Sequence, residues 1–233
     1  MLLEILYQDE HLIAINKPHG LAVHASKMHR FDEFFALQVL RDQIGQKVYP
    51  AHRLDKKTSG VLLFGLEKEM DAKLQMLFAA NEVAKTYHAI LRGFVLEDGE
   101  VDYALVNNQD KEQEAISNYK VFEKFEIDLA FGAHPTSRYT LIELKPQTGR
   151  YHQLRKHMSH IQHPIIGDRP HGCNKQNKLW KERFNNDFMM LHAMSIQFIH
   201  PITNELLTIE APYSTAFEHG LQILKGNLES FKI

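Results

Sequence analysis

The stretch AHRLDKKTSGVLLFGL, residues Ala51–Leu66, places a single carboxylate among cations and just ahead of an apolar run. Asp55 follows one arginine and precedes two lysines, and a Thr-Ser-Gly turn leads into Val61–Leu66. A short apolar run bounded by turn residues is typical of a buried strand. Because nearby positive charges favour the ionised carboxylate, we predict that Asp55 acts as a nucleophile or base and not as a proton donor.

Asp55 has two other interpretations. Most aspartates form surface ion pairs or cap turns, but the apolar neighbours Leu54 and Val61–Phe64 predict partial burial, where an acid is uncommon. The segment DKKTSG also resembles an aspartyl-phosphate motif, in which the Asp ends an apolar strand and carboxylates elsewhere bind Mg²⁺. In this chain the apolar strand follows the Asp, so we set aside the interpretation of Asp55 as an aspartyl-phosphate residue.

Length and composition limit the class of protein. The 233 residues suffice for one large domain or two small ones. Without an internal repeat or linker, we predict a single domain over residues 1–233. No apolar run is long enough to cross a bilayer, the first ten residues lack an export signal, and the lone Cys173 excludes an internal disulfide. We therefore expect a soluble cytoplasmic monomer that has no membrane partner.

The net charge of −2 hides an asymmetry along the chain. Residues 138–200 contain ten Lys/Arg, four Asp/Glu and seven of the fifteen histidines, whereas the remainder carries a balance of −8. A basic face on a mildly acidic body suits a polyanion such as RNA. Charges that scatter over a solvated surface once the chain folds are an equally good explanation, so charge alone does not identify the partner.

Hydrophobic periodicity predicts more strands than helices. The expected strands are Leu2–Tyr7, Leu12–Asn16, Val61–Leu66, Val83–Val95, Val101–Val106, one or two within Ile116–Phe131, Tyr139–Leu144, Met189–His200 and Leu206–Pro212. The expected helices are Phe34–Ile44, Glu69–Ala80, Arg150–Ile161, a helical turn at Lys178–Phe184, and Thr215–Leu224 capped by Ser214, while Asn107–Glu114 is expected to be a loop. Because the strands cluster and do not alternate with helices, we predict an α+β fold with a mixed, mostly antiparallel sheet flanked by helices and loops.

The expected helix Arg150–Ile161 carries a second candidate residue. Steps of 100° place Tyr151, Leu154 and Met158 on one apolar arc. Arg150 falls at the edge of this arc in the first turn and points inward. The spacing therefore predicts that Arg150 is directed toward the interior of the protein.

Metal and cofactor motifs are absent from the sequence. Four histidines lie on or near residues 150–163 without an HExxH pair, and Cys173 has no CxxC partner. No GxGxxG or Walker loop occurs. We expect neither a metal nor a cofactor. Tyr87, within an expected strand, is either a packing residue or a platform for stacking on a base.

Five segments resemble, in family order and over nearly the whole chain, the motifs of the RluA-type pseudouridine synthases. The HRLDxxTSG signature is matched at 52–60, the KxY strand at 85–87 and the TGRxHQ(L/I)R helix start at 148–155. The opening NKPxG turn is matched at 16–20, and the late LHA…HP strand at 191–193 with 200–201. Within the family, residues 3–20, 41–55 and 163–177 are most similar to the tRNA-modifying branch.

The resemblance implies the pseudouridine synthase catalytic fold, without an S4-like domain in front, and an isomerase that turns uridine in RNA into pseudouridine. It implies that Asp55, Tyr87 and Arg150 are catalytic: Asp55 as nucleophile or base, Tyr87 stacked on the uracil, and Arg150 paired with Asp55. The residues expected to contact the substrate are His52, Arg53, Leu54, Thr58, Arg155, Lys156 and Leu191.

Three functions remain open at this point. The resemblance implies modification of tRNA, at the uridine of position 65 in the T stem. Ribosomal RNA is the alternative substrate, because several relatives in the family act on it. An RNA-binding or RNA-folding protein without activity is a third interpretation, and the presence of Asp55, Tyr87 and Arg150 argues against it.

Overall fold

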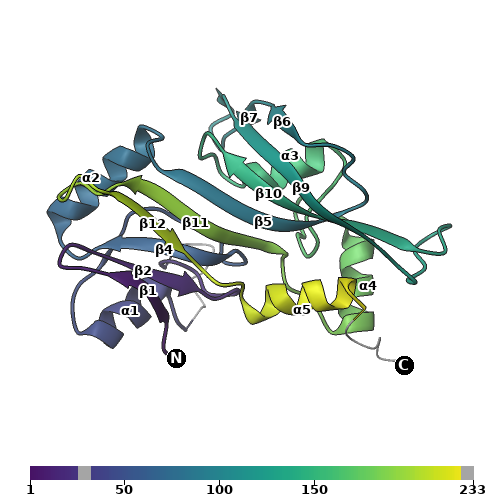
Figure 1. The fold of residues 1–233 in the computed structure, drawn as a ribbon, viewed down its shortest axis with the longest axis horizontal. Coiled ribbons are helices and arrows are strands. Elements are labelled where there is room, and N and C mark those ends of the chain that lie inside the picture. Colours follow the sequence, from purple (N-terminus) through teal and green to yellow (C-terminus); the bar gives the residue numbers. More distant parts are fainter. Residues whose placement is uncertain (26–32, 227–233) are drawn as a thin grey trace. The chain divides into compact units, whose positions relative to one another are not determined.

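A computed structural model describes residues 1–25 and 33–226 of the chain. Contacts divide it into two compact units. The first unit is Met1–Lys85 with Ala193–Ser214, and the second unit is Thr86–His192 with Thr215–Ile233. Whether the whole chain forms a single domain stays a prediction, and each unit is described by itself (Figure 1).

The first unit is built on strands that pair in the order β1-β2-β4-β11, with β12 beside β11 and β3 beside β4. These strands are β1 (Glu4–Gln8), β2 (Leu12–Lys17), β3 (Tyr49–Pro50), β4 (Ser59–Gly65), β11 (Leu191–Ile199) and β12 (Leu206–Glu210). The pairs β1–β2, β2–β4, β3–β4 and β11–β12 are antiparallel. The apolar run Val61–Leu66 therefore belongs to an interior strand, β4, as its sequence predicts.

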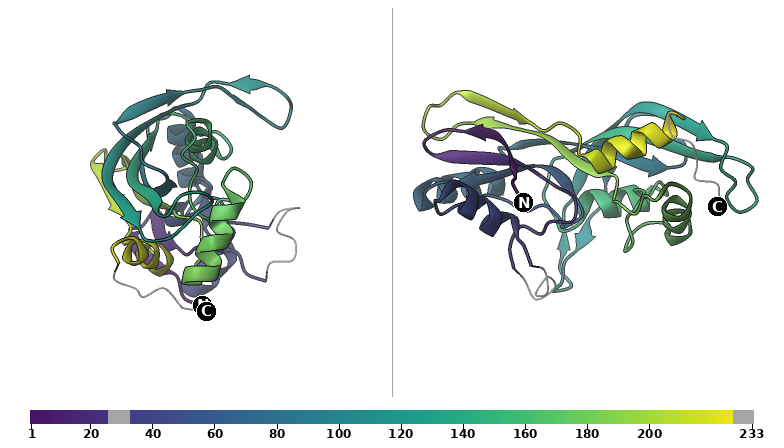
Figure 2. Two further views of the ribbon diagram at one scale, coloured as in Figure 1. Left: turned by 90° about the vertical axis from the view of Figure 1, so that its right-hand side faces the viewer. Right: turned by 90° about the horizontal axis from the view of Figure 1, so that it is seen from below.

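Two helices cover one face of this sheet (Figure 2, right). They are α1 (Ala36–Ile44) and α2 (Lys68–Ala79). Helix α1 ends at Gly45, whose φ of 68° is the left-handed conformation that glycine adopts without steric cost. Helix α2 buries Met70 and Leu74 in a core that it shares with β2, β4 and the β11–β12 pair. Removing this apolar face from water is the main stabilising contribution to the unit.

Two residues of the expected Thr-Ser-Gly turn, Ser59 and Gly60, are the first residues of β4, and this strand explains the glycine. All seven residues of Ser59–Gly65 are buried. Gly60 has φ +106°, and a Cβ atom placed on it would lie 2.1 Å from the carbonyl oxygen of Ala193 on β11. Because no side chain fits so close to backbone, only glycine permits this approach of the two strands.

The second unit contains strands in the order β5-β10-β9-β6 and a separate β7–β8 pair. Their bounds are β5 (Ala84–Arg92), β6 (Gly99–Asp102), β7 (Leu105–Val106), β8 (Glu112–Gln113), β9 (Ile116–Ile127) and β10 (Ser137–Pro146). The pairs β5–β10, β10–β9, β9–β6 and β7–β8 are antiparallel. The prediction that Asn107–Glu114 is a loop is wrong at its end, because β8 pairs with β7 there.

The helices of the second unit are α3 (Gln153–His160), α4 (Asn174–Phe184) and α5 (Thr215–Leu224). Helix α4 is longer than the helical turn expected at its C-terminal part, because Trp180, Phe184 and Gln176 are buried along one side. The indole Nε1–H of Trp180 donates to the hydroxyl of Tyr139 on β10 at 2.8 Å. Helix α5 packs Gly220 against Met190 and Ile90, so α4 and α5 are both fixed to the sheet by tertiary contacts.

The predicted fold class is confirmed: helices accompany a mostly antiparallel sheet. The expected helix Arg150–Ile161 begins later than its periodicity suggests, at Gln153, because His152 has a φ of 55° that interrupts helical geometry. Within residues 1–25 and 33–226, no helix is both long and apolar enough to span a membrane.

Candidate active site

Asp55 lies in a tight turn of the first unit. The amide of Thr58 donates to the main-chain carbonyl of Asp55 at 3.0 Å, and the amide of Gly20 donates to that of Lys56 at 2.8 Å. Leu54, Thr58 and Ser59 are buried on either side, whereas Asp55 is half-buried. The backbone of this turn is thus held by its own hydrogen bonds, and Asp55 remains partly exposed.

A buried cation, Lys17, supports this turn. Its Nζ donates to the carbonyls of Pro18 and Leu21 at 2.9 Å each, and to that of Lys56 at 3.3 Å. Burial lowers the pKa of Lys17 to about 7, and the charge of Asp55 opposes this shift. The NKPxG motif located the turn, but it did not identify Lys17 as a residue of the site. The only signal was a lysine at the end of an apolar strand.

Lys17 predicts how stability depends on pH. The unfolded side chain keeps its proton up to about pH 10.5, whereas the folded one loses it near pH 7. Since the unfolded state then binds more protons, the free energy of unfolding should rise between pH 7 and 10, by at most about 1.4 kcal/mol per pH unit. Urea unfolding at several pH values measures this slope. Lys17→Met should flatten it, and Lys73→Met, at an exposed position of α2, should not. Equal slopes in wild type and Lys17→Met would contradict this assignment.

His52 and Arg53 differ in environment although they are neighbours. The ring of His52 stacks on Phe78 with centroids 4.6 Å apart, and its Nε2 accepts a hydrogen bond from the amide of Leu63 at 3.1 Å. Burial, helped by the charge of Lys85, lowers the pKa of His52 to about 4. His52 is therefore neutral at pH 7 and braces the turn. Arg53 is exposed and can extend toward a ligand.

In the second unit, two of the predicted catalytic residues, Tyr87 and Arg150, lie at the same end of the sheet. Tyr87, near the start of β5, lies opposite Leu144 near the end of β10. Pro146, the last residue of β10, lies opposite Ser117 at the start of β9. The turn at 147–152, which carries Arg150, leaves β10 at this end. Antiparallel pairing therefore brings half-buried Tyr87 and this turn to the same edge of the sheet.

Gln153 ties the turn to β9. Its Oε1 accepts from the Thr148 hydroxyl at 2.8 Å and from the Arg150 amide at 3.0 Å. Its Nε2 donates to the carbonyl of Ile116 and to the hydroxyl of Ser117, both at 2.9 Å. All four hydrogen-bonding positions of the side-chain amide are used, and Gln153 is buried. A buried polar group satisfied in this way specifies one geometry for the turn.

The hydrogen-bond chain continues from Ser117 to His157. His157 Nδ1 lies 3.0 Å from the Ser117 hydroxyl, and its Nε2 lies 3.0 Å from the carbonyl of Tyr103. A carbonyl only accepts, so Nε2 carries the proton and Nδ1 accepts from Ser117. Burial lowers the pKa of His157. It is a structural histidine and not a metal ligand or phosphate contact.

Arg150 is fixed at its base and only partly exposed. Its amide is held by Gln153, and its Nε donates to the carbonyl of Glu114 at 2.9 Å. It lies before α3 and not in the first turn of a helix, which corrects the expected placement. The pairing of Arg150 with Asp55 stays a prediction.

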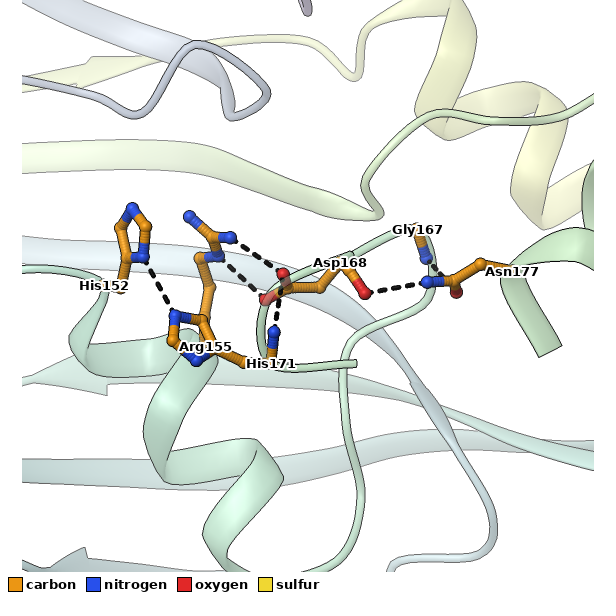
Figure 3. Close-up of polar contacts among 6 residues, drawn as sticks. All are labelled: His152, Arg155, Gly167, Asp168, His171 and Asn177. Carbon is orange, nitrogen blue, oxygen red and sulfur yellow. Dashed lines mark hydrogen bonds and ion pairs between the residues drawn. The ribbon is translucent and has the colours of Figure 1, made fainter. Parts of the chain in front are cut away.

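Arg155, by contrast, is buried in an ion pair (Figure 3). Its Nε and Nη2 donate to the two carboxylate oxygens of Asp168, each at 2.8 Å. Arg155 is 7% exposed and Asp168 is 1% exposed. The next residue, Lys156, is half-buried, and its Nζ lies 5.9 Å from the ring centroid of the exposed Tyr151. Arg155 thus has a structural partner that its sequence position did not reveal, and its expected contact with the substrate stays a prediction.

His152 joins the start of α3 to the segment after it. Its Nδ1 lies 3.0 Å from Nε2 of His171, and its ring stacks on Tyr151 with centroids 3.7 Å apart. The remaining expected substrate contact, Leu191, is buried at the start of β11. In the part of the chain that the structure describes, no three His, Cys, Asp or Glu side chains are grouped to hold a metal ion.

Comparisons with known proteins identify the family of the chain. A family model described as RNA pseudouridylate synthase matches residues 11–160. The tRNA pseudouridine synthase C of Vibrio parahaemolyticus is 48% identical over 220 residues, which cover 90% of this chain and 89% of that protein. The protein of the same name from Pasteurella multocida is 46% identical over 241 residues and covers 99% of both chains.

Two solved structures have the same fold. Human RNA pseudouridylate synthase domain containing 4 aligns with a TM-score of 0.73 and 26% identity over 95% of this chain and 93% of that one. Human RNA pseudouridylate synthase domain containing 1 aligns with the same TM-score and 21% identity, over 99% of this chain and 97% of that one. At this identity, the similarity concerns only the fold. With a family model across more than half of its length, and relatives nearly half identical along almost all of it, this chain belongs to the RNA pseudouridylate synthase family, and it is an isomerase that acts on uridine in RNA.

Proposed function

We propose that this enzyme forms pseudouridine in tRNA, at the uridine of position 65 in the T stem. The observation that carries the proposal is the similarity, along almost the whole chain, to proteins named tRNA pseudouridine synthase C. The position within the T stem rests on the sequence resemblance to the tRNA-modifying branch. Ribosomal RNA is the second candidate substrate, because the family that the sequence resembles also contains enzymes that act on it.

The reaction needs a nucleophile or base and no net redox change. The bond between C1′ of the ribose and N1 of uracil breaks, the base turns, and a bond forms between C1′ and C5. C5 loses a proton and N1 gains one, so atoms and electrons balance within the nucleotide. We assign the first step to the carboxylate of Asp55, which the turn presents half-buried with its main-chain atoms already bonded.

The other site residues receive roles from their surroundings. We assign stacking on the uracil to Tyr87, whose half-buried ring lies at the sheet edge that carries the turn at 147–152. Aromatic stacking of this kind is common in RNA recognition. We assign the exposed Arg53 to the space that the uridine leaves in the stem, because flipping a base costs a few kcal/mol and a cation at the gap offsets part of that cost.

The cation that pairs with Asp55 is assigned to Arg150. The amide of Arg150 is fixed by Gln153 and its Nε by the Glu114 carbonyl. The backbone and the Nε of Arg150 are therefore held in place, and we assign the two terminal nitrogens of its guanidinium to the carboxylate of Asp55. An arginine that binds a carboxylate through two parallel N–H groups fixes its direction as well as its charge, which a nucleophile requires.

The test of the substrate is a map of pseudouridine in total RNA from a strain that lacks the gene. Loss of pseudouridine at one tRNA uridine, restored by the gene on a plasmid, supports the proposal. Loss of a pseudouridine in ribosomal RNA instead would identify ribosomal RNA, the second candidate, as the substrate. Persistence of every pseudouridine would contradict both.

The RNA-binding surface yields a separate prediction. Lys178 and Lys181 are exposed on α4, where each has only a weak surface partner at 3.4–3.6 Å, Glu182 and Asp187 respectively. If both lysines contact phosphates, Lys178→Ala with Lys181→Ala should reduce the slope of log Kd against log salt by about 2. Filter binding of tRNA at several salt concentrations measures it. Removing Lys68 and Lys73, exposed on α2, is the control for charge loss alone. An unchanged slope in the α4 variant would place the RNA elsewhere.

A further inference from the structure

We propose that a cavity in the second unit binds a nucleotide, with Arg92 receiving its phosphate. The cavity has a volume of about 380 Å³, which lies within the range of about 300–1,000 Å³ that small-molecule sites occupy. The nucleotide is either free or part of an RNA chain, and the two sources differ in what they predict for tRNA binding. The site stands whichever uridine the enzyme modifies.

The cavity lies where the end of β5, the connection between β9 and β10, and the start of α4 meet. All of its lining residues belong to the second unit. Arg92, the last residue of β5, is five residues beyond Tyr87, which is about 16 Å along a strand. Because successive side chains of a strand alternate between the two faces of a sheet, Arg92 and Tyr87 point to opposite faces. The cavity is therefore separate from the position assigned to the uracil.

Arg92 is a half-buried cation at the wall of this cavity. Its guanidinium carbon lies 5.4 Å from the ring centroid of Phe131, which also lines the cavity. Within residues 1–25 and 33–226, no carboxylate pairs with Arg92 and no oxygen accepts from its guanidinium. Removing a charge partly from water without a partner is unfavourable. An anion in the cavity supplies this partner, and the planar fork of an arginine matches a phosphate.

The second arginine of the cavity, Arg138, is already balanced by a carboxylate. Its Nε donates to Oε1 of Glu126 at 3.2 Å. Glu126 also accepts from the hydroxyl of Thr136. The hydrogen bonds from Thr136 and Arg138 lower the pKa of Glu126, so that its negative charge is present at neutral pH and offsets that of Arg138. Arg92 therefore remains as the cation that an entering anion would meet.

The loop that covers the cavity is held by its own hydrogen bonds. Phe131 and His134 form an isolated antiparallel bridge, in which the two amide-to-carbonyl distances are 2.9 and 3.1 Å. Gly132, between them, has the left-handed φ of +61° that so tight a turn requires. The hydroxyl of the buried Ser137 donates to the carbonyl of Leu129 at 2.6 Å. A wall that is formed in advance loses little conformational entropy when a ligand binds.

Gln176, at the start of α4, gives the cavity an acceptor. It is 2% exposed, and its Nε2 donates to the hydroxyl of Tyr139. No group in the described parts of the chain donates to its Oε1, and this oxygen is not fully enclosed. The cavity thus lacks an anion at Arg92 and a donor at Gln176. A nucleotide carries both, because it has a phosphate as well as hydroxyl and amino groups.

Trp180 can report on binding, because it is the one tryptophan of the chain and its indole donates to the same Tyr139 hydroxyl as Gln176. The purified enzyme is titrated with adenosine 5′-monophosphate while the fluorescence of Trp180 is recorded. We expect a saturable change. Adenosine, which lacks the phosphate, should bind at least about 10-fold more weakly, since a hydrogen bond to a charged group contributes this much.

The matched variants are Arg92→Gln and Arg41→Gln. Each removes one positive charge, but Arg41 lies on α1, where it pairs with the exposed Asp42. We expect Arg92→Gln to bind adenosine 5′-monophosphate at least about 10-fold more weakly than wild type, and Arg41→Gln to bind it as wild type does. Equal affinity of wild type for adenosine and for its monophosphate would overturn the assignment of a phosphate to Arg92.

Binding of tRNA distinguishes the two sources of the nucleotide. If RNA supplies the phosphate, the Kd for tRNA in filter binding should be at least about threefold higher in Arg92→Gln than in Arg41→Gln. If the ligand is a free nucleotide, both variants should bind tRNA equally and only the monophosphate should lose affinity. Either result supports the site. If neither tRNA nor the monophosphate binds Arg92→Gln more weakly than Arg41→Gln, the proposal is wrong.

Chemical labelling tests the site in the unaltered enzyme, even if Arg92→Gln fails to fold. An arginine-selective dicarbonyl reagent is applied with and without adenosine 5′-monophosphate or tRNA, and modified peptides are identified by mass spectrometry. We expect either ligand to protect Arg92 and neither to protect Arg41. An Arg92 that does not react, or that neither ligand protects, would refute the site. An enzyme that modifies no tRNA would contradict the proposed function while leaving this measurement intact.

Discussion

Asp55→Asn is expected to reduce pseudouridine formation by at least about 1,000-fold in single-turnover experiments, as losses of catalytic nucleophiles do. The amide of asparagine has the shape of the carboxylate but neither its charge nor its basicity, so it cannot attack or deprotonate the nucleotide. The fold should survive, because the hydrogen bond that closes the turn uses the main-chain carbonyl of Asp55 and not its side chain.

The measurement combines a purified system with a cellular one. A tRNA transcript is incubated with excess enzyme and pseudouridine is mapped chemically, and the same variant is used to complement the deletion strain. Asp42→Asn, which removes an exposed carboxylate beside Arg41, is the matched control and should complement fully. If the Asp55→Asn variant restored the missing pseudouridine, the assignment of the first chemical step to Asp55 would be wrong.

The second large effect is expected at Arg150. Arg150→Ala should lower turnover by about 1,000-fold, of the order seen when a group that fixes a catalytic residue is removed, with only a modest loss of RNA binding. The reason is that the guanidinium is assigned to Asp55 and not to phosphate. Single-turnover rates and filter-binding Kd values separate the two effects. A variant that binds RNA poorly but reacts at the wild-type rate once saturated would refute this role.

Arg155 supplies the sharpest comparison with Arg150. Arg155→Lys keeps a positive charge, but a lysine ammonium cannot reproduce the two parallel bonds to Asp168. If Arg150→Ala reacted normally, the assignment of Arg150 as the partner of Asp55 would be wrong, whatever the activity of Arg155→Lys. If Arg150→Ala alone were inactive, the assignment to Arg150 would stand. Melting curves of both variants ensure that neither effect reflects loss of the fold.

Most strands and helices could be predicted from the sequence because their apolar residues recur with regular spacing. The run Val61–Leu66 is β4 within one or two residues, and α1 and α2 begin and end close to their predicted bounds. Gly45 ends α1 in the expected left-handed conformation. Periodicity reports which side chains are removed from water, and burial is the largest contribution to folding, so the elements that it specifies are recovered.

The elements that were missed depend on long-range contacts. Helix α3 starts at Gln153 and not Arg150, because Gln153 binds Thr148 and residues of β9, more than 30 positions earlier in the chain. The N-terminal part of α4 carries Gln176 and Asn177, which contact β10 and the turn at Asp168. A polar residue that pairs with a distant partner leaves no period in the sequence, so its burial is invisible there.

By itself, the sequence determined the fold class and the family motifs, and it predicts Asp55 as the reacting acid, because these are read from local order. Only the tertiary structure decided that Lys17 is buried beneath the turn of Asp55, that Gly60 is required by the close approach of Ala193, and that Arg155 is oriented by Asp168. Each of these facts concerns the distance between atoms far apart in the chain. That distance is set by packing and by the need to satisfy buried polar groups, which no local pattern encodes.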